Sequence, residues 1–187
     1  MDAFLYITVL VLATGGLVIL RWRFATFRAQ QPHEYEGMAP DFDLREHLTG
    51  KLVSDGMIFG PTGRMSARFR ARILGTWTDG HGVIAEEFRF DGGGQQSRSW
   101  RFTLREGGRF RADADDVVGS GSGTIVGPTI RLSYRIVLPK DAGGHTLDVI
   151  DWMYLTQGGT IINRSQFRKF GFKVAEIIAT IRPDKGE

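Results

Sequence analysis

Residues 65–73 read MSARFRARI, and their side chains alternate in polarity along the stretch. The odd-numbered positions are apolar, whereas Arg68, Arg70 and Arg72 occupy even-numbered positions. Successive side chains of a β-strand point to opposite faces of the sheet, so this alternation predicts a strand with one buried and one solvated face. The stretch therefore indicates an antiparallel sheet with a single apolar side.

The same alternation recurs later in the chain. Trp100, Phe102 and Leu104 alternate with polar residues, as do the even-numbered positions of 130–138. Turn-forming pairs such as Asp79-Gly80 separate these stretches at intervals of about 8 to 15 residues, which predicts about 8 to 10 short strands. A one-sided core over so many hairpins is best buried by closing the sheet on itself. We therefore expect an all-β fold, a small antiparallel up-and-down barrel, in preference to a sandwich.

The composition excludes several classes of protein. The 187 residues are 42% hydrophobic and 24% charged with a net charge of +3, which is typical of a folded chain and not of a disordered one. The absence of cysteine excludes disulfide scaffolds, thiolate zinc sites, cysteine nucleophiles and a lipidated cysteine. Four histidines offer few ligands, so we expect neither a metal ion nor a cofactor.

The first residues form a candidate membrane span. Phe4–Leu20 is an uncharged run of 17 residues that covers about 26 Å of hydrocarbon as a helix. Trp22 follows where an aromatic ring lies at headgroup level, and three arginines at positions 21, 23 and 28 predict a cytoplasmic barrel by the positive-inside rule. A cleavable signal peptide is the alternative, but such peptides begin with basic residues and this chain begins with an acidic one, Asp2.

Three parts are expected along the chain. Residues 1–23 form an N-terminal membrane anchor, residues 24–40 a polar juxtamembrane linker, and residues 41–187 the β-barrel domain. At the start of the barrel domain, Asp43 and Glu46 match a capping box, which predicts a short helix over residues 44–48.

Strand pairing predicts charged side chains inside the barrel. With a turn at residues 156–159, Asp151 lies opposite Arg164. The preceding hairpin places Leu132 opposite Asp151. Cross-strand partners share a face, so both charged residues would point into the apolar interior.

A second pairing adds two more charges. Across a turn at residues 91–94 with one bulged residue, Glu86 lies on the same face as Arg98 and Trp100. Two acids and two arginines would then share an otherwise apolar lumen. Buried charges are costly unless they are paired, so such a cluster needs a reason.

The functional interpretation of this cluster is a ligand pocket. An arginine would hold an anionic headgroup or carboxylate, and the aromatic wall would hold the lipophilic part. The structural alternative is a set of ion pairs that joins strands, or a register shift by one residue that places these groups in water. The candidate ligand-binding residues are Arg98, Arg164, Asp151, Glu86, Phe88, Trp100, Phe102 and Tyr134.

The other polar motifs carry weaker signals. Outward-facing arginines indicate a solvated face with attraction to anionic lipid as the alternative, and no basic run supports nucleic-acid binding. Asp113, Asp115 and Asp116 alternate as in a cation site, but solvation or capping of a turn is the preferred interpretation. No metalloprotease, nucleophile-elbow or phosphate-loop motif is present.

Four motifs together resemble a bacterial family of unknown function. They are Gly75-Thr76-Trp77, 115–119 (DDVVG), 151–155 (DWMYL) and 163–172 (NRSQFRKFGF). The sequence is similar over residues 42–183 to the domain of unknown function numbered three-eight-three-three. The resemblance implies a calycin-like barrel, implies an envelope lipoprotein for many members, and implies no reaction or functional residues. Its periplasmic placement opposes the cytoplasmic side that the arginines favour.

Three functions compete at this stage. The leading hypothesis is a non-enzymatic module, tethered to a bacterial inner membrane, that binds a lipophilic anionic molecule or a lipid. The second is an enzyme or accessory factor in membrane-lipid modification, with Asp151 or Glu86 as an acid or base of raised pKa. The third is an assembly protein that binds a protein partner through its arginine-rich outer strands.

Overall fold

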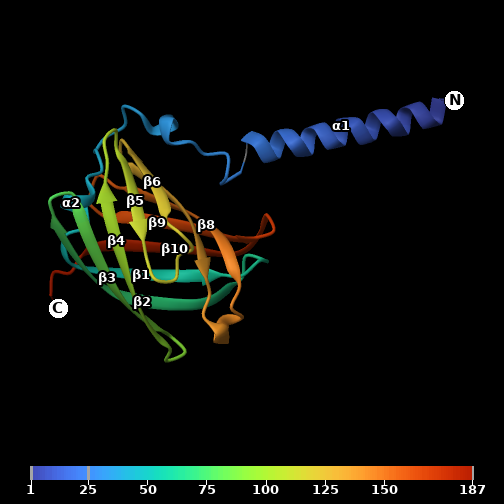
Figure 1. Ribbon diagram of the computed structural model, residues 1–187. Helices are drawn as coiled ribbons and strands as arrows, with labels where there is room; N and C mark the ends of the chain where they lie inside the picture. Colours follow the sequence, from blue (N-terminus) through green and yellow to red (C-terminus); the bar gives the residue numbers. More distant parts are fainter. Residues whose placement is uncertain (1, 25, 187) are drawn as a thin grey trace. The chain divides into compact units, whose positions relative to one another are not determined.

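A computed structural model describes residues 2–24 and 26–186 (Figure 1). The chain forms two compact units, Met1–Glu34 and Tyr35–Glu187. The second unit holds ten strands and the short helix that precedes them. The helices are α1 (Asp2–Phe24), the 3-10 helix η1 (Pro32–Tyr35), α2 (Leu44–His47) and the 3-10 helix η2 (Lys140–Ala142). The strands are β1 (Gly50–Phe59), β2 (Met65–Thr78), β3 (His81–Phe90), β4 (Gln95–Leu104), β5 (Arg109–Asp113), β6 (Gly121–Val126), β7 (Thr129–Val137), β8 (Thr146–Leu155), β9 (Ile161–Lys169) and β10 (Phe172–Pro183).

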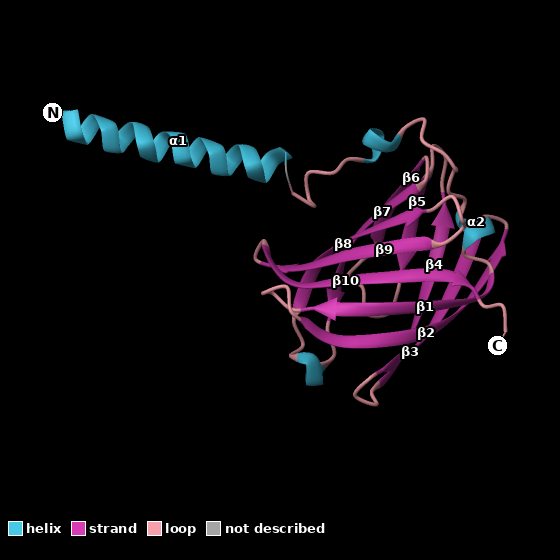
Figure 2. Cartoon of the chain, turned by 180° about the vertical axis from the view of Figure 1, so that it is seen from behind, coloured by secondary structure: helices cyan, strands magenta, loops and turns pink. Residues whose placement is uncertain are grey.

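The strands form a closed antiparallel barrel with up-and-down topology. Each strand pairs with its neighbours in sequence, and β1 pairs with β10 to complete the ring. Figure 2 shows the strands curving around one interior. The predicted all-β barrel is confirmed, because closure leaves no unpaired sheet edge and gives every strand one face toward a common core.

Alternation along β2 shows how the sequence makes this interior. Phe69, Ala71 and Ile73 are buried, whereas the three arginines between them and before them, at positions 68, 70 and 72, are exposed. Each fully buried large apolar side chain contributes about 1.5–3 kcal/mol. Residues from nearly all of the strands join this core, which explains why short individual strands produce one stable unit.

One end of the barrel is covered by α2 and the residue that follows it. Asp43 caps the helix as predicted, by accepting a hydrogen bond from the Arg45 backbone N–H at 2.7 Å. The Asp43 N–H donates to His47 Nδ1 at 3.2 Å, in place of the Glu46 side chain that a capping box would use. Leu44 and Leu48 are buried in the barrel core. Trp77 Nε1 donates a hydrogen bond to the Leu48 carbonyl at 3.0 Å, which fixes the segment to β2.

The first unit contains the candidate membrane span. Ala3–Arg21 has a mean hydropathy of 2.4 and is long and apolar enough, by length and composition, to cross a bilayer. A signal sequence at the N-terminus satisfies the same criteria, so the helix fits a single-pass anchor or a signal sequence. The side chains of residues 22–24 and the whole of Ala25 lie outside the described residues, and so does the predicted interfacial ring of Trp22.

Candidate functional site

The barrel interior contains a cavity of about 120 Å³. An engineered apolar cavity of roughly 150 Å³ holds benzene, so this volume suits a small organic molecule. Seven of the eight residues that the sequence proposed as ligand-binding line it, namely Glu86, Phe88, Arg98, Trp100, Phe102, Tyr134 and Asp151. The strand pairings explain this, because Glu86 faces Arg98 and Leu132 faces Asp151 as predicted.

Arg98 is the central cation of the cavity wall. Its Nε and Nη2 atoms donate hydrogen bonds to Asp116 Oδ1 at 3.2 and 3.0 Å. The guanidinium carbon lies 4.1 Å from the ring centroid of Trp100 and 5.6 Å from that of Tyr134. The side chain is only 15% exposed, so the ion pair and both ring contacts offset its desolvation.

Asp116 is a site residue that sequence reasoning missed. It lies between β5 and β6, in a segment whose backbone is held against β7 by the hydrogen bond from Val137 N to Asp116 O at 2.8 Å. The predicted solvation fits Asp115, whose side chain is 92% exposed, but it does not describe Asp116, which is 26% exposed. Each of the three aspartates pairs with an arginine: Asp113 with Arg111, Asp115 with Arg101 and Asp116 with Arg98.

The described residues contain no group of acidic or histidine side chains able to hold a metal ion. The three aspartates therefore act as separate counterions to three arginines. The sequence marked Asp116 twice, in the pattern with Asp113 and Asp115 and in the 115–119 motif of the resembled family, but neither signal pointed to Arg98.

Asp151 is the buried carboxyl of the cavity. It is 7% exposed, and its Oδ1 atom has no hydrogen-bond partner among the described residues. Burial raises the pKa of Asp151 above its usual range, against the opposing effects of Ser165, Arg98 and Tyr134. A buried acceptor without a donor is costly, so this oxygen is a candidate contact for a ligand.

Glu86 is the second acid of the cavity. Burial raises its pKa to about 7, and the negative charges of Asp151 and Asp116 add to this while Arg98 opposes it. The carboxyl group is surrounded by protein yet borders the cavity, which explains its intermediate accessibility. Near neutral pH it therefore exchanges between its charged and neutral forms.

The aromatic part of the lining is made of interacting rings. The Trp100 and Tyr134 centroids are 5.1 Å apart with the rings edge to face, and the Phe69 and Phe88 centroids are 5.4 Å apart. Such pairs add about 0.5–1.5 kcal/mol beyond burial. Sequence reasoning missed Phe69 as a lining residue, although its alternation marked it as core.

The prediction that Arg164 faces the interior is wrong. The hairpin register pairs Asp151 with Ser165 and Trp152 with Arg164, one residue away from the predicted pairing. The turn contains residues 156–160 because Thr156 Oγ1 donates to the Thr160 carbonyl at 2.8 Å and accepts from the Thr160 N–H at 3.1 Å. The extra residue moves Arg164 to the outer face and brings Asn163 and Ser165 into the cavity lining.

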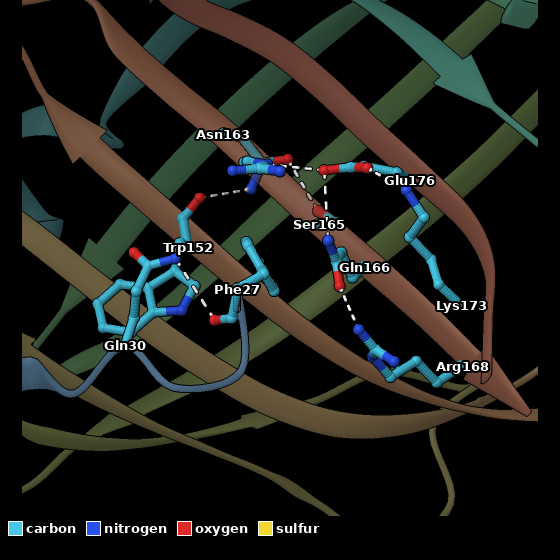
Figure 3. Close-up of polar contacts among 10 residues, drawn as sticks. Phe27, Gln30, Trp152, Asn163, Ser165, Gln166, Arg168, Lys173 and Glu176 are labelled. Atoms are coloured by element: carbon cyan, nitrogen blue, oxygen red, sulfur yellow. Dashed lines mark hydrogen bonds and ion pairs between the residues drawn. The ribbon is translucent and has the colours of Figure 1, made fainter. Parts of the chain in front are cut away.

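On the outer face, Arg164 pairs with Glu176 and so joins a separate polar network. Figure 3 labels Glu176, Lys173, Gln166 and Arg168 of this network. The Arg164 Nε lies 2.7 Å from Glu176 Oε1, and Lys173 Nζ lies 2.8 Å from Glu176 Oε2. Burial opposes ionisation of Glu176, but Lys173 and Arg164 outweigh it and lower the pKa of this carboxyl. This network joins β9 to β10 outside the barrel and has no role in the cavity.

The motifs and the fold together identify the family. Residues 22–183 match the family described as "Protein of unknown function (DUF3833)". The chain belongs to this family. The DUF3833 match includes every strand of the barrel and begins directly after the candidate span, Ala3–Arg21. The resemblance that the four motifs predicted is therefore confirmed. Among curated proteins, no detectable sequence relative of this DUF3833 chain was found.

Two solved structures share the barrel fold of this DUF3833 domain. The S-type phycobiliprotein lyase CPES from Guillardia theta has a TM-score of 0.55 and 9% identity, covering 77% of this chain and 92% of its own. Rv2717c from M. tuberculosis has a TM-score of 0.53 and 15% identity, covering 79% of this chain and 99% of its own. At these identities the likeness shows the fold alone, which is consistent with the calycin-like barrel that the resemblance implied.

Proposed function

We propose that the barrel is a non-enzymatic binding module whose cavity holds a small lipophilic molecule bearing a protonated amine or a similar N–H donor. The observation that carries this proposal is Asp151 Oδ1, a buried acceptor on the cavity wall without a hydrogen-bond partner among the described residues. A donor from the ligand would satisfy this oxygen, while Trp100 and Phe102 would contact the apolar body.

The charge balance of the cavity supports a cationic group over an anionic one. The anionic ligand expected from the sequence relied on two interior arginines, but Arg164 lies outside and Arg98 is already paired with Asp116. Glu86 and Asp151 remain as carboxyls without an interior arginine of their own. An anionic ligand would add a further negative charge there, whereas a cation would stabilise the ionised forms of both acids.

The stability lost by burying the two carboxyl groups also supports the presence of a ligand site. Raised pKa values mean that the folded state disfavours the charged forms of Glu86 and Asp151, so both groups reduce stability at neutral pH. An apolar core of the same volume would avoid this cost. Perturbed acids that border a cavity are characteristic of binding and catalytic sites. The cavity volume favours a small molecule over a complete lipid tail.

A matched set of aromatic probes tests the sign of the ligand charge. The full chain in detergent micelles is titrated with 2-phenylethylamine, 3-phenylpropionate and ethylbenzene, and its thermal unfolding is followed by tryptophan fluorescence. We expect the amine to raise Tm progressively with concentration and the carboxylate to have no effect, because linkage stabilises only the state that binds. A Tm increase with the carboxylate alone would overturn the proposal.

Two variants of β8 separate the cavity from the surface. Asp151→Asn should abolish the Tm increase with the amine, because it removes the charged acceptor. Asp148→Asn, an exposed position on the same strand, is the control and should keep the effect. Mass spectrometry of the chain purified from its membrane fraction would then identify the natural ligand. An equal response in both variants would place the amine outside the cavity.

A second candidate function rests on Glu86. A carboxyl with a pKa of about 7 beside Asp151 has the property required of a general acid or base, which suits an enzyme acting on a small or lipid substrate. The test is the lipid profile of a strain that lacks the gene. A lipid species restored by the wild-type chain and by neither Glu86→Gln nor Asp151→Asn would favour catalysis over binding.

We also propose that α1 is retained as a single-pass anchor in a bacterial inner membrane. Its length and hydropathy, which suffice to cross a bilayer, support this proposal. The intact mass of the chain from the membrane fraction tests this, because cleavage would remove the helix. Protease accessibility in spheroplasts would then assign the side of the barrel, where the arginines near α1 favour the cytoplasm.

A further inference from the structure

The turn between β9 and β10 exposes two phenylalanines. Phe170 is 87% exposed and Phe172 is 77% exposed, the highest values of the exposed aromatic residues in the barrel unit. The tips of several other hairpins are formed by glycine, proline and polar residues, such as Pro61-Thr62-Gly63, Asp91-Gly92-Gly93 and Gln157-Gly158-Gly159. The β5–β6 connection also exposes an apolar side chain, Val118, but only to 38%. Large exposed apolar groups that lie together mark an interaction site.

The positive φ of this turn is unfavourable for a phenylalanine at position 170. Lys169 pairs with Phe172, so the two-residue loop is Phe170-Gly171, with φ of 52° and 84°. Such loops need positive φ at both positions and favour Asn-Gly, whereas a bulky residue in this region is strained. An exposed aromatic residue with a strained backbone does not stabilise the barrel, which points to a contact outside it.

The charges around the turn identify the kind of partner. Residues 168–173 contain Arg168, Lys169 and Lys173 and no acidic residue, although Lys173 is paired with Glu176 further along β10. Lys169 Nζ lies 5.6 Å from the Phe170 ring centroid, and Arg168 Nη1 donates to the Gly171 carbonyl at 2.8 Å. Apolar side chains flanked by basic ones match an anionic bilayer surface, where the rings enter the headgroup region and the cations contact phosphates.

Up-and-down topology places another lysine at this end of the barrel. The β7–β8 connection lies at the same end as the β9–β10 turn, and Lys169 Nζ contacts His145 Nδ1 from that connection at 2.9 Å. Lys140, in η2 of the same connection, is exposed. Three of the chain's five lysines are therefore at or beside this tip.

We propose that the β9–β10 tip, residues 168–173, is a membrane contact that inserts Phe170 and Phe172 into the interfacial region of an anionic lipid bilayer. The contact is independent of the interior cavity and of its ligand. The chain carries a candidate span before the barrel, so a bilayer is the extended surface available to this tip. Two contacts, α1 and the tip, would restrain the barrel more than a single flexible tether does.

Site-directed spin labelling tests this proposal, because the chain has no cysteine and a single introduced one is unique. The full chain with Phe172→Cys is labelled with a nitroxide and reconstituted in vesicles of phosphatidylcholine containing phosphatidylglycerol. Gly92→Cys at the β3–β4 tip and Gln157→Cys at the β8–β9 tip are the controls, both exposed. We expect the label at position 172 to lose accessibility to an aqueous nickel chelate and to gain accessibility to oxygen relative to both controls.

A double variant and a second vesicle composition distinguish lipid binding from binding to a protein partner and from misfolding. Lys169→Gln with Phe170→Asn should return the label at position 172 to water, while the barrel keeps a cooperative thermal transition. Vesicles of phosphatidylcholine alone should also reduce the protection, because the basic residues then lose their counterions. A label at position 172 as accessible as both controls would overturn the proposal. Protection that requires an added protein would assign the tip to a protein partner and overturn it as well.

Discussion

Phe170 illustrates how a single residue can depart from the local preference of its backbone. Among the described residues, only Asp79 and Phe170 have positive φ without being glycine, at 46° and 52°. Aspartate tolerates this region because its short side chain bonds locally, but phenylalanine does not. Phe170 therefore reduces the stability of its hairpin. Because its ring is exposed, burial within the barrel does not compensate for this strain.

Phe170→Asn should stabilise the fold. Asparagine followed by Gly171 is the preferred sequence for this turn, so the free energy of unfolding should rise by about 0.5–1 kcal/mol. Denaturant unfolding of the full chain in micelles, followed by barrel tryptophan fluorescence, measures this. Phe172→Asn is the matched control, because position 172 lies in β10 and gains no such relief. A lower stability for Phe170→Asn would contradict the backbone argument.

At the scale of elements, the covered end of the barrel depends on one close backbone contact. Leu48 follows α2, and its carbonyl oxygen would lie 1.9 Å from a Cβ atom at Gly75 of β2. The obstructing atom is backbone that also accepts the Trp77 hydrogen bond, so it cannot move without breaking that contact. Glycine at position 75 is therefore a steric requirement for docking α2 on the barrel.

Gly75→Ala should destabilise the barrel through this contact. We expect the free energy of unfolding to fall by about 2 kcal/mol or more, in the range of overpacked cores. Gly92→Ala is the control, since a Cβ there meets nothing within 4 Å, and it should stay within about 0.5 kcal/mol of wild type. Denaturant midpoints compare the variants. Equal effects of the two substitutions would show that α2 is not held as described.

At the scale of the whole molecule, the acids of the cavity make stability depend on pH. The pKa of Glu86 is about 7 in the folded barrel against a usual value of 4.5, and the pKa of Asp151 is raised in the same direction. The folded state thus binds protons more tightly than the unfolded state between these values. The contribution of these two acids to the free energy of unfolding is fully present at low pH. For Glu86 it is lost as the pH rises through about 7.

Glu86→Gln should remove part of this dependence. At pH about 8 the variant should exceed wild type in unfolding free energy by about 1–3 kcal/mol, and the difference should vanish toward pH about 4, where Glu86 is neutral in both states. Acids of lowered pKa such as Glu176 lose their contribution at lower pH, outside this window. Glu87→Gln, exposed on the same strand, is the control. We would be wrong about the direction of this effect if the unfolding free energy of the wild type increased from pH 5 to 8 and Glu86→Gln removed that increase.

Polarity patterns along the chain are enough to predict the barrel and most of its interior. The alternation in β2 assigned Phe69 and Ile73 to the core, and the turn between β3 and β4 with one added residue placed Glu86 on the face of Arg98. Such inferences succeed because strand side chains repeat with a period of two and antiparallel pairing is fixed by the turn.

The positions of the remaining charges depend on contacts between distant parts of the chain. Arg164 and Asp151 lie on opposite faces of the sheet because Thr156 hydrogen-bonds across a turn one residue longer than predicted. Asp116 contacts Arg98 from the β5–β6 connection. This connection is held in place by β7, which comes later in the chain than both residues. Register and loop placement depend on side-chain hydrogen bonds and non-local packing, which polarity alternation along a strand does not encode.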